Sequence, residues 1–103
     1  MRNFVPVAVK PVASSPVPAV SGSAGSLNWA ALARCESGGR VDAVSPGGLY
    51  YGLYQFSPAT WRAVGGSGLP SQASAAEQTA RAQALYTRSG AGQWPVCGRN
   101  LFT

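Results

Sequence analysis

Between residues 27 and 37, the apolar residues recur with the spacing of one face of an α-helix. That face lies at positions i, i+3, i+4 and i+7 and consists of Trp29, Leu32, Ala33 and Glu36. Ser26 or Asn28 can cap the start of such a helix, and Gly38-Gly39 can end it. The pattern predicts a helix that starts at about residue 27 or 28, ends at residue 37 and places Glu36 on its apolar face.

Two further helices are predicted by their start and stop signals. Ser57-Pro58 is typical of a helix N-terminus, with the serine as the cap and the proline in the first turn, and Gly65-Gly66 ends that helix. Ser74 and Glu77 have the spacing of a capping box, and the helix of about fifteen residues that they open ends at Gly90. Glu77 is therefore expected to have a structural role.

The segment between the first two helices has the pattern of an extended chain. Pro46-Gly47-Gly48 is a strong turn signal, and residues 49 to 56 that follow it are rich in aromatic side chains. We expect a short β-hairpin or an extended strand here. The predicted fold class is therefore α+β and mostly helical.

The first 25 residues differ from the rest of the chain in composition. They consist mainly of Val, Pro, Ala, Ser and Gly, with prolines at positions 6, 11, 16 and 18 that disfavour helix and strand pairing. We interpret residues 1–25 as an extended linker or anchoring tail and residues 26–103 as the folded domain. The valines leave open that the tail adds as a strand to a partner protein.

Two cysteines permit one intramolecular pair, Cys35 with Cys97. A domain of this size is marginal on hydrophobic burial alone, and a disulfide that closes so long a loop would contribute about 4 kcal/mol. The alternative is a pair of free thiols in a cytosolic protein. A disulfide would instead indicate an oxidising compartment outside the cytoplasm.

No apolar run approaches the roughly 20 residues of a membrane helix, so we expect no membrane span. The N-terminus does not resemble a secretory signal, because Pro6, Lys10 and Pro11 interrupt its hydrophobic region. Two explanations stay open. Either a signal was removed ahead of Met1, or the protein leaves the cytoplasm by another route such as phage lysis.

Charge and residue types argue against several functions. The net charge is +5, but the arginines of the domain are scattered without a nucleic-acid motif, and a surface suited to an anionic cell envelope explains the charge equally well. The chain has no histidine and three acidic residues, too few for a metal site. It also lacks a phosphate-binding glycine motif. We expect neither a metal nor a cofactor.

Glu36 is the strongest candidate for acid/base chemistry. Glu77 is assigned to a helix cap, and Asp42 lies beside a turn where an Asx hydrogen bond is its expected use. On the apolar face at a helix C-terminus, desolvation and the helix dipole would both destabilise the Glu36 carboxylate and favour the protonated form that a general acid needs. The alternative is an ordinary last-turn residue paired with Arg40.

Tyr50, Tyr51 and Gln55 are candidates for binding sugars. Aromatic rings on an extended segment can form a platform for sugar rings, and a glutamine amide can bond sugar hydroxyls or an N-acetyl group. Core packing is the alternative for either tyrosine, and a single glutamine is a weak signal.

Several short runs, taken in order, resemble the resuscitation-promoting factor domain, a small lysozyme-like module secreted by actinobacteria. These runs are Cys35-Glu36-Ser37-Gly38-Gly39, Tyr50-Tyr51-Gly52, Gln55-Phe56-Ser57-Pro58-Ala59-Thr60-Trp61, Gly65-Gly66, Ala73-Ser74, Glu77-Gln78 and Trp94-Pro95-Val96-Cys97. They span about Leu27 to Leu101. Arg40-Val41 departs from the usual Asn-Trp of that family, and residues 42–46 and 53–54 are similar to the wider group of lytic transglycosylases.

The resemblance implies a lysozyme-like fold and an enzyme that cleaves the β-1,4 bond between MurNAc and GlcNAc in peptidoglycan. Glu36 would be the catalytic acid. The sugar-binding cleft would be lined by Tyr50, Tyr51, Gln55, Thr60 and Trp61. The resemblance also implies a disulfide between Cys35 and Cys97 and a place outside the cell or at the cell wall.

The shortage of acids favours lytic transglycosylation over hydrolysis, because ordinary glycosidases use two carboxylates. In the family's one-carboxylate mechanism, Glu36 acts as acid and then as base while a hydroxyl of the same sugar closes an anhydro ring. Two alternatives stay open. One is a non-catalytic module of the same fold that binds peptidoglycan or a partner hydrolase, and the other is a wall-penetrating component of a phage virion, anchored to virion proteins through residues 1–25.

Overall fold

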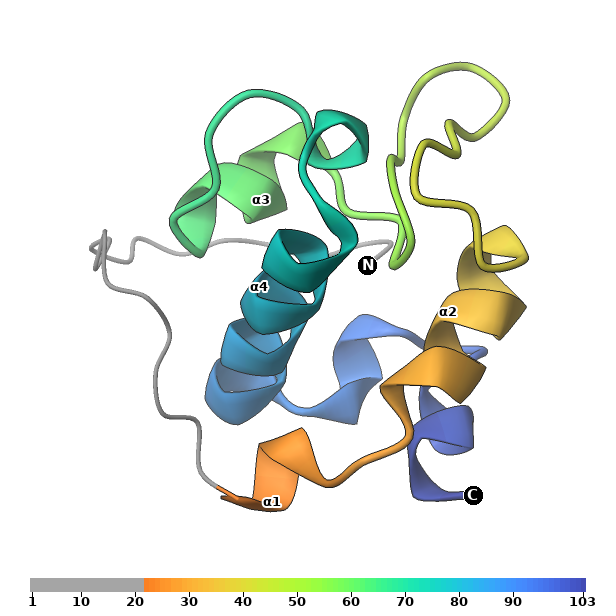
Figure 1. The fold of residues 1–103 in the computed structure, drawn as a ribbon, viewed down its shortest axis with the longest axis vertical. Helices are drawn as coiled ribbons and strands as arrows, with labels where there is room; N and C mark the ends of the chain where they lie inside the picture. The colour runs from red at the N-terminus through yellow and green to blue at the C-terminus, as the bar shows by residue number, and fades with distance from the viewer. Residues whose placement is uncertain (1–21) are drawn as a thin grey trace.

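The longest helix of the domain is α4, Ala75–Ser89, in a computed structural model that describes residues 22–103. Its cap is Ser74, whose side-chain oxygen accepts a hydrogen bond of 3.0 Å from the backbone N–H of Glu77. Gly90 ends the helix. The capping signals thus predicted both ends of this helix (Figure 1), but the Glu77 carboxylate bonds to Arg81 and does not complete the expected capping box.

Helix α2, Trp29–Ser37, carries the predicted apolar face. Asn28 is its cap, because the Asn28 Oδ1 accepts a hydrogen bond of 3.0 Å from the backbone N–H of Ala31. At the other end Gly38 adopts a left-handed conformation, with φ of 74°, and its N–H bonds to carbonyls of the last turn. Both predicted ends of α2 are confirmed, with Asn28 and not Ser26 as the cap.

Helix α3, Pro58–Ala63, is short and begins as predicted, with Ser57 as its cap and the proline in its first turn. Val64 caps its C-terminus. The chain then turns beneath the indole of Trp61, which would collide with any side chain at Gly66. Here the absence of a Cβ lets the backbone pass directly against the ring.

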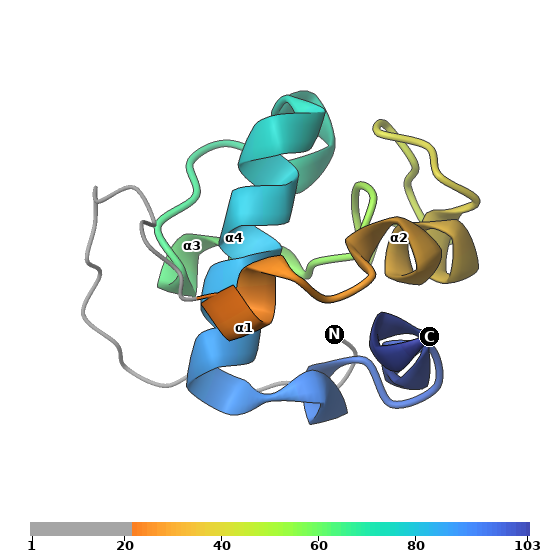
Figure 2. The ribbon, with the colours of Figure 1, turned by 60° about the horizontal axis from the view of Figure 1, so that its bottom comes forward.

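Three 3-10 helices complete the domain: η1 (Pro70–Gln72), η2 (Ala91–Gln93) and η3 (Gly98–Phe102). The C-terminal segment lies alongside α2 in both views (Figures 1 and 2). The backbone N–H of Asn28 donates to the carbonyl of Leu101 at 2.9 Å, and the Asn28 Nδ2 donates to the Thr103 Oγ1 at 3.2 Å. The C-terminal segment therefore fixes the start of α2.

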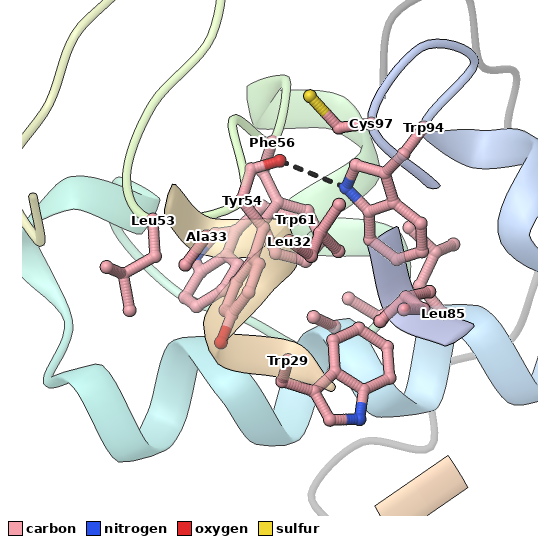
Figure 3. Close-up of a cluster of buried hydrophobic side chains, with 13 residues drawn as sticks. Trp29, Leu32, Ala33, Leu53, Tyr54, Phe56, Trp61, Leu85, Trp94 and Cys97 are labelled. Atoms are coloured by element: carbon pink, nitrogen blue, oxygen red, sulfur yellow. Dashed lines mark hydrogen bonds between the residues drawn. The ribbon is translucent and has the colours of Figure 1, made fainter. Parts of the chain in front are cut away.

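The core combines aliphatic side chains with aromatic side chains that meet edge to face (Figure 3). The ring of Trp29 lies 5.9 Å from Tyr54, 6.1 Å from Tyr86 and 5.8 Å from Trp94, centroid to centroid, with steep interplanar angles. The Trp94 indole N–H donates to the carbonyl of Tyr54 at 3.1 Å. These contacts hold α2, α4, the turn at residues 52–55 and the C-terminal segment together.

The N-terminal boundary of packed structure differs from the expected one. Residues Gly22–Gly25 form a short helix, α1, whereas the sequence favoured an extended tail up to residue 25. Ala24 is buried, and its carbonyl accepts a hydrogen bond of 2.7 Å from the Trp29 indole N–H. A buried indole N–H needs such a partner, which explains why these small residues pack against the domain. Residues 1–21 of the predicted tail lie outside the described part of the chain.

Little β-structure forms in the expected hairpin. Two isolated antiparallel bridges join Val44 to Tyr51 and Tyr51 to Phe56. The chain between them reverses in a tight turn, with Gly52 at φ 84° and Gln55 at φ 56°, so a continuous strand over residues 49–56 cannot form. The predicted fold class is nevertheless confirmed: the domain is mostly helical, with minor β-structure and one disulfide. Among residues 22–103, no helix is long and apolar enough to span a membrane.

Candidate active site

Glu36 lies in the last turn of α2 and is partly buried. The same helix buries Trp29, Leu32 and Ala33, so the predicted face is the one that packs on the core. The backbone carbonyl of Ala33 accepts a hydrogen bond of 3.0 Å from the Ser37 Oγ, which reinforces this last turn. Glu36 is thus held in the last turn of a packed helix, shortly before the loop that follows it.

A disulfide between Cys35 and Cys97 anchors the end of α2. It joins residues 62 positions apart, with the Cα atoms separated by 5.8 Å. Cys97 is buried in the core and Cys35 is exposed on the helix surface. The predicted pairing is confirmed, and it places a covalent bond one residue before Glu36.

The segment that we call the 40–51 loop runs from the end of α2 to the turn at residues 52–55. The backbone N–H of Ser45 donates to the carbonyl of Tyr50 at 2.9 Å, and the Ser45 Oγ accepts from the N–H of Tyr50 at 3.0 Å. The N–H of Gly48 donates to the carbonyl of Ser45 at 2.8 Å. The loop is therefore closed by its own hydrogen bonds.

Tyr50 and Tyr51, two predicted sugar-binding residues, lie at the end of the 40–51 loop and are both partly buried. The Tyr51 hydroxyl donates to the carbonyl of Gly48 at 2.8 Å, and the Tyr51 backbone pairs with Phe56 in both directions. The loop also exposes aliphatic side chains, of which Leu49 is 61% exposed. The loop therefore presents aromatic and aliphatic groups beyond the end of α2.

Gln55, Thr60 and Trp61, the other predicted sugar-binding residues, lie inside the domain. The Gln55 Nε2 donates to the carbonyl of Gly52 at 2.9 Å. Thr60 and Trp61 are each 1% exposed, with the Thr60 Oγ1 bonded to the hydroxyl of its own helix cap at 2.9 Å and the Trp61 indole N–H bonded to the carbonyl of Ser67 at 3.1 Å. Their polar groups bond to the turn at residues 52–55, to the cap of helix α3 and to the loop that follows α3.

The other two acidic residues of the chain lie on α4 and in the 40–51 loop. The Glu77 Oε2 accepts a hydrogen bond of 2.6 Å from the Arg81 Nε, four residues further along α4. The Arg81 guanidinium also donates to the carbonyl of Val64 at 2.9 Å. Asp42 lies exposed in the turn after α2. Within residues 22–103 no group of His, Cys, Asp and Glu side chains is suited to hold a metal.

Gln78 is a buried polar residue to which the sequence assigned no role. Its side chain has no exposed surface and makes three hydrogen bonds to backbone groups. Its helical spacing could have predicted its burial, because Gln78 shares the buried face of α4 with Ala82 and Leu85, at i, i+4 and i+7. A glutamine on an apolar helix face must find partners for both ends of its amide.

A family profile described as the transglycosylase-like domain matches residues 23–97, most of the chain and all of the site above. The chain belongs to this family. The catalytic candidate Glu36, the 40–51 loop and the disulfide of this transglycosylase-like domain all lie within the matched residues.

The curated relatives are resuscitation-promoting factors, the family that the short sequence runs resemble. The resuscitation-promoting factor Rpf of Micrococcus luteus is 48% identical over 73 residues, which are 71% of this chain and 32% of that protein. The factor RpfE of Mycobacterium tuberculosis is 47% identical over 74 residues, 72% of this chain and 42% of that protein. RpfC of the same species is 48% identical over 80 residues, with shares of 78% and 56%. The chain therefore spans between about a third and just over half of these relatives, and the resemblance to the resuscitation-promoting factor domain is confirmed.

Proposed function

We propose that this transglycosylase-like domain cleaves the glycan strand of peptidoglycan at the β-1,4 bond between MurNAc and GlcNAc, with Glu36 as the catalytic acid. The observation that carries the proposal is the position of Glu36. It is a partly buried carboxylate in the last turn of α2, next to the disulfide and within the residues that match the family. A disulfide that holds this turn keeps the acid in one place relative to the substrate.

The proposed mechanism uses Glu36 twice. As an acid, it gives its proton to the glycosidic oxygen, and the bond from that oxygen to the anomeric carbon of MurNAc breaks. The resulting carboxylate then accepts the proton of the C6 hydroxyl of the same MurNAc, whose oxygen bonds to the anomeric carbon and closes a 1,6-anhydro ring. The proton that left Glu36 is thereby restored to it.

The placement of the other carboxylates supports this one-acid mechanism over hydrolysis. A hydrolase of the usual kind needs a second carboxylate to activate water or to attack the sugar. Glu77 is held in an ion pair with Arg81 on α4, and Asp42 is an exposed turn residue. We therefore favour lytic transglycosylation, with the muramidase reaction as the alternative.

We assign two kinds of role to the proposed sugar-binding residues. Tyr50 and Tyr51, on the 40–51 loop, would contact the glycan strand directly. Gln55, Thr60 and Trp61 would support the binding surface from within, because their side chains are buried and already bonded to the domain.

Glu36→Gln tests the proposal, with Glu77→Gln as the control for loss of a carboxylate elsewhere. Both variants and the wild type are incubated with purified peptidoglycan, and the released fragments are identified by mass spectrometry. We expect fragments with anhydro ends from the wild type and from Glu77→Gln, and none from Glu36→Gln. Reducing ends would assign the reaction to hydrolysis, and full release by Glu36→Gln would exclude Glu36 as the essential acid.

A non-catalytic module that binds peptidoglycan is the second candidate function. The exposed apolar side chains of the 40–51 loop favour it, because such a surface can bind a glycan strand without cleaving it. Retention of the wild-type domain on insoluble peptidoglycan without any released fragment would support it. The relatives named above are bacterial proteins, and nothing in the comparisons supports a phage virion component.

We also propose that the domain acts outside the cell and that residues 1–25 attach it to a partner protein.

A further inference from the structure

Gln78 lies in the first turns of α4 with no exposed surface, and the structure gives its amide three partners from three separate segments. The Gln78 Oε1 accepts a hydrogen bond of 2.7 Å from the backbone N–H of Leu53. The Gln78 Nε2 donates to the carbonyl of Val41 at 3.2 Å and to the carbonyl of Ala73 at 2.9 Å. With all of these hydrogen bonds the amide can be buried without a loss of stability. Without them, its burial would destabilise the folded domain.

Two of these partners are the two ends of the 40–51 loop. Val41 lies near its start, just after α2, and Leu53 lies in the turn just beyond its end. One side-chain amide therefore ties both ends of the loop to α4. The two ends are also joined to each other, because the N–H of Gly52 donates to the carbonyl of Ala43 at 2.7 Å.

The fit between the amide and the loop is close. Gly52 packs against Gln78 so tightly that a Cβ at this position would collide with the amide oxygen. The contact with Gln78 therefore fixes the position of Gly52, just beyond the end of the 40–51 loop. A core leucine or methionine of similar size would fill the space but would leave three backbone groups without their partners.

We infer that Gln78 is a positioning residue, which places the 40–51 loop and its tyrosines relative to Glu36 and so governs how well the glycan strand binds. The inference rests on the proposed function, because it assigns the loop to substrate binding. Gln78 does not act on the reacting atoms. Glu36 belongs to α2 and precedes the loop, and its helix end is held independently by the disulfide.

Gln78→Met tests this role, because methionine keeps the volume of the side chain and removes all three hydrogen bonds. Arg81→Met is the matched control on the same helix: it loses the bonds to Glu77 and to the carbonyl of Val64, which hold the end of α3. Kinetics are measured with soluble fragments of peptidoglycan glycan strands. For Gln78→Met we expect KM to rise about tenfold and kcat to change less than about twofold. This pattern indicates the loss of an interaction that stabilises the bound substrate and the transition state equally. For Arg81→Met both constants should stay within about twofold of the wild type, because its lost bonds lie away from the loop.

Hydrogen exchange of the loop amides provides a readout that does not depend on activity. In Gln78→Met the amides of Ser45, Gly52 and Leu53 should exchange faster relative to those of the α4 core, and in Arg81→Met they should not. If the wild type releases no fragments, the proposed function fails, and the exchange data alone decide whether Gln78 positions the loop.

If Gln78→Met does not fold, Gln78→Glu replaces it, since glutamate retains the acceptor for Leu53 and loses the donors to Val41 and Ala73.

Three results would overturn the inference. The first is an unchanged KM in Gln78→Met when the wild type is active. The second is unchanged hydrogen exchange of the loop amides in Gln78→Met. The third is failure of both Gln78 variants to fold while Arg81→Met folds, which would show that Gln78 is needed for folding and not specifically for the position of the loop.

Discussion

Gly52 packs directly against the side-chain amide of Gln78, which leaves no space for a Cβ atom. Gly52 also has a φ of 84°, in the left-handed region that disfavours other residues. Sequence positions 26 residues apart are thus fitted to each other, at the end of the 40–51 loop that follows α2.

Gly52→Ala should therefore destabilise the domain by about 2 to 3 kcal/mol, because it combines backbone strain with a steric clash in a buried site. Gly47→Ala is the control. Gly47 has a similar φ of 89° but no neighbouring atom within 4 Å of an added Cβ, so it should lose only the backbone contribution of about 1 kcal/mol. Urea denaturation of both variants measures the difference, and equal losses would contradict a role for the Gln78 contact.

Local signals in the sequence predicted α2 and α4 with both of their ends, and the start of α3. Ser57, Ser74 and the glycines after α2 act on groups within a few residues, so their effects can be read without knowing the fold. The disulfide followed from a count of two cysteines together with the family resemblance. Glu36 could be singled out because the chain has few acids and because it falls on the apolar face of a predicted helix.

Long-range contacts explain what the sequence did not predict. The turn at residues 52–55 depends on Gln78 and on Trp94, which donates to the carbonyl of Tyr54 from 40 positions away. Gln55 adopts a left-handed conformation that is unusual for its residue type, so an extended strand was the natural expectation. The burial of Thr60 and Trp61 likewise depends on partners in the core that no local pattern reveals.

Loss of the disulfide should cost the domain a large part of its stability. The double variant Cys35→Ser, Cys97→Ser should lose about 4 kcal/mol, the chain-entropy value for a closed loop of this length. A loss of that size would leave a small domain near its unfolding midpoint at ordinary temperature. Thermal unfolding of the wild type should shift similarly on addition of a thiol reductant, whereas the double variant should not respond. A melting temperature unchanged by either treatment would contradict a stabilising role.

Glu36→Asp should fold normally and lose most of its activity. The shorter side chain keeps a carboxylate but withdraws it from the position that Glu36 occupies at the end of α2, and misplacement of a catalytic group by about 1 Å can reduce the rate about a hundredfold. Release of fragments from peptidoglycan measures the activity, and a thermal melt checks the fold. Glu77→Gln, a change at the carboxylate that pairs with Arg81 on α4, is the control and should retain activity. Full activity in Glu36→Asp would show that the position of the acid is not critical.

Tyr54→Phe should remove part of the alkaline pH dependence of stability. Burial raises the pKa of the Tyr54 hydroxyl above its ordinary value of 10.0, and the hydrogen bond of 2.8 Å to the Thr79 Oγ1 partly opposes that rise. Because the pKa is higher in the folded state, the stabilising contribution of the protonated hydroxyl is complete below the unfolded pKa. It is lost as the pH rises through the folded pKa.

Near neutral pH, Tyr54→Phe should cost about 1 kcal/mol through the lost hydrogen bond. Its stability should then fall less steeply than that of the wild type when the pH is raised above the ordinary tyrosine value. Thr79→Val is the comparison, because it removes the hydrogen bond and leaves Tyr54 able to ionise, so its steep alkaline decline should remain. Urea denaturation across this pH range measures all three proteins. Parallel curves for Tyr54→Phe and the wild type would show that ionisation of Tyr54 does not limit alkaline stability.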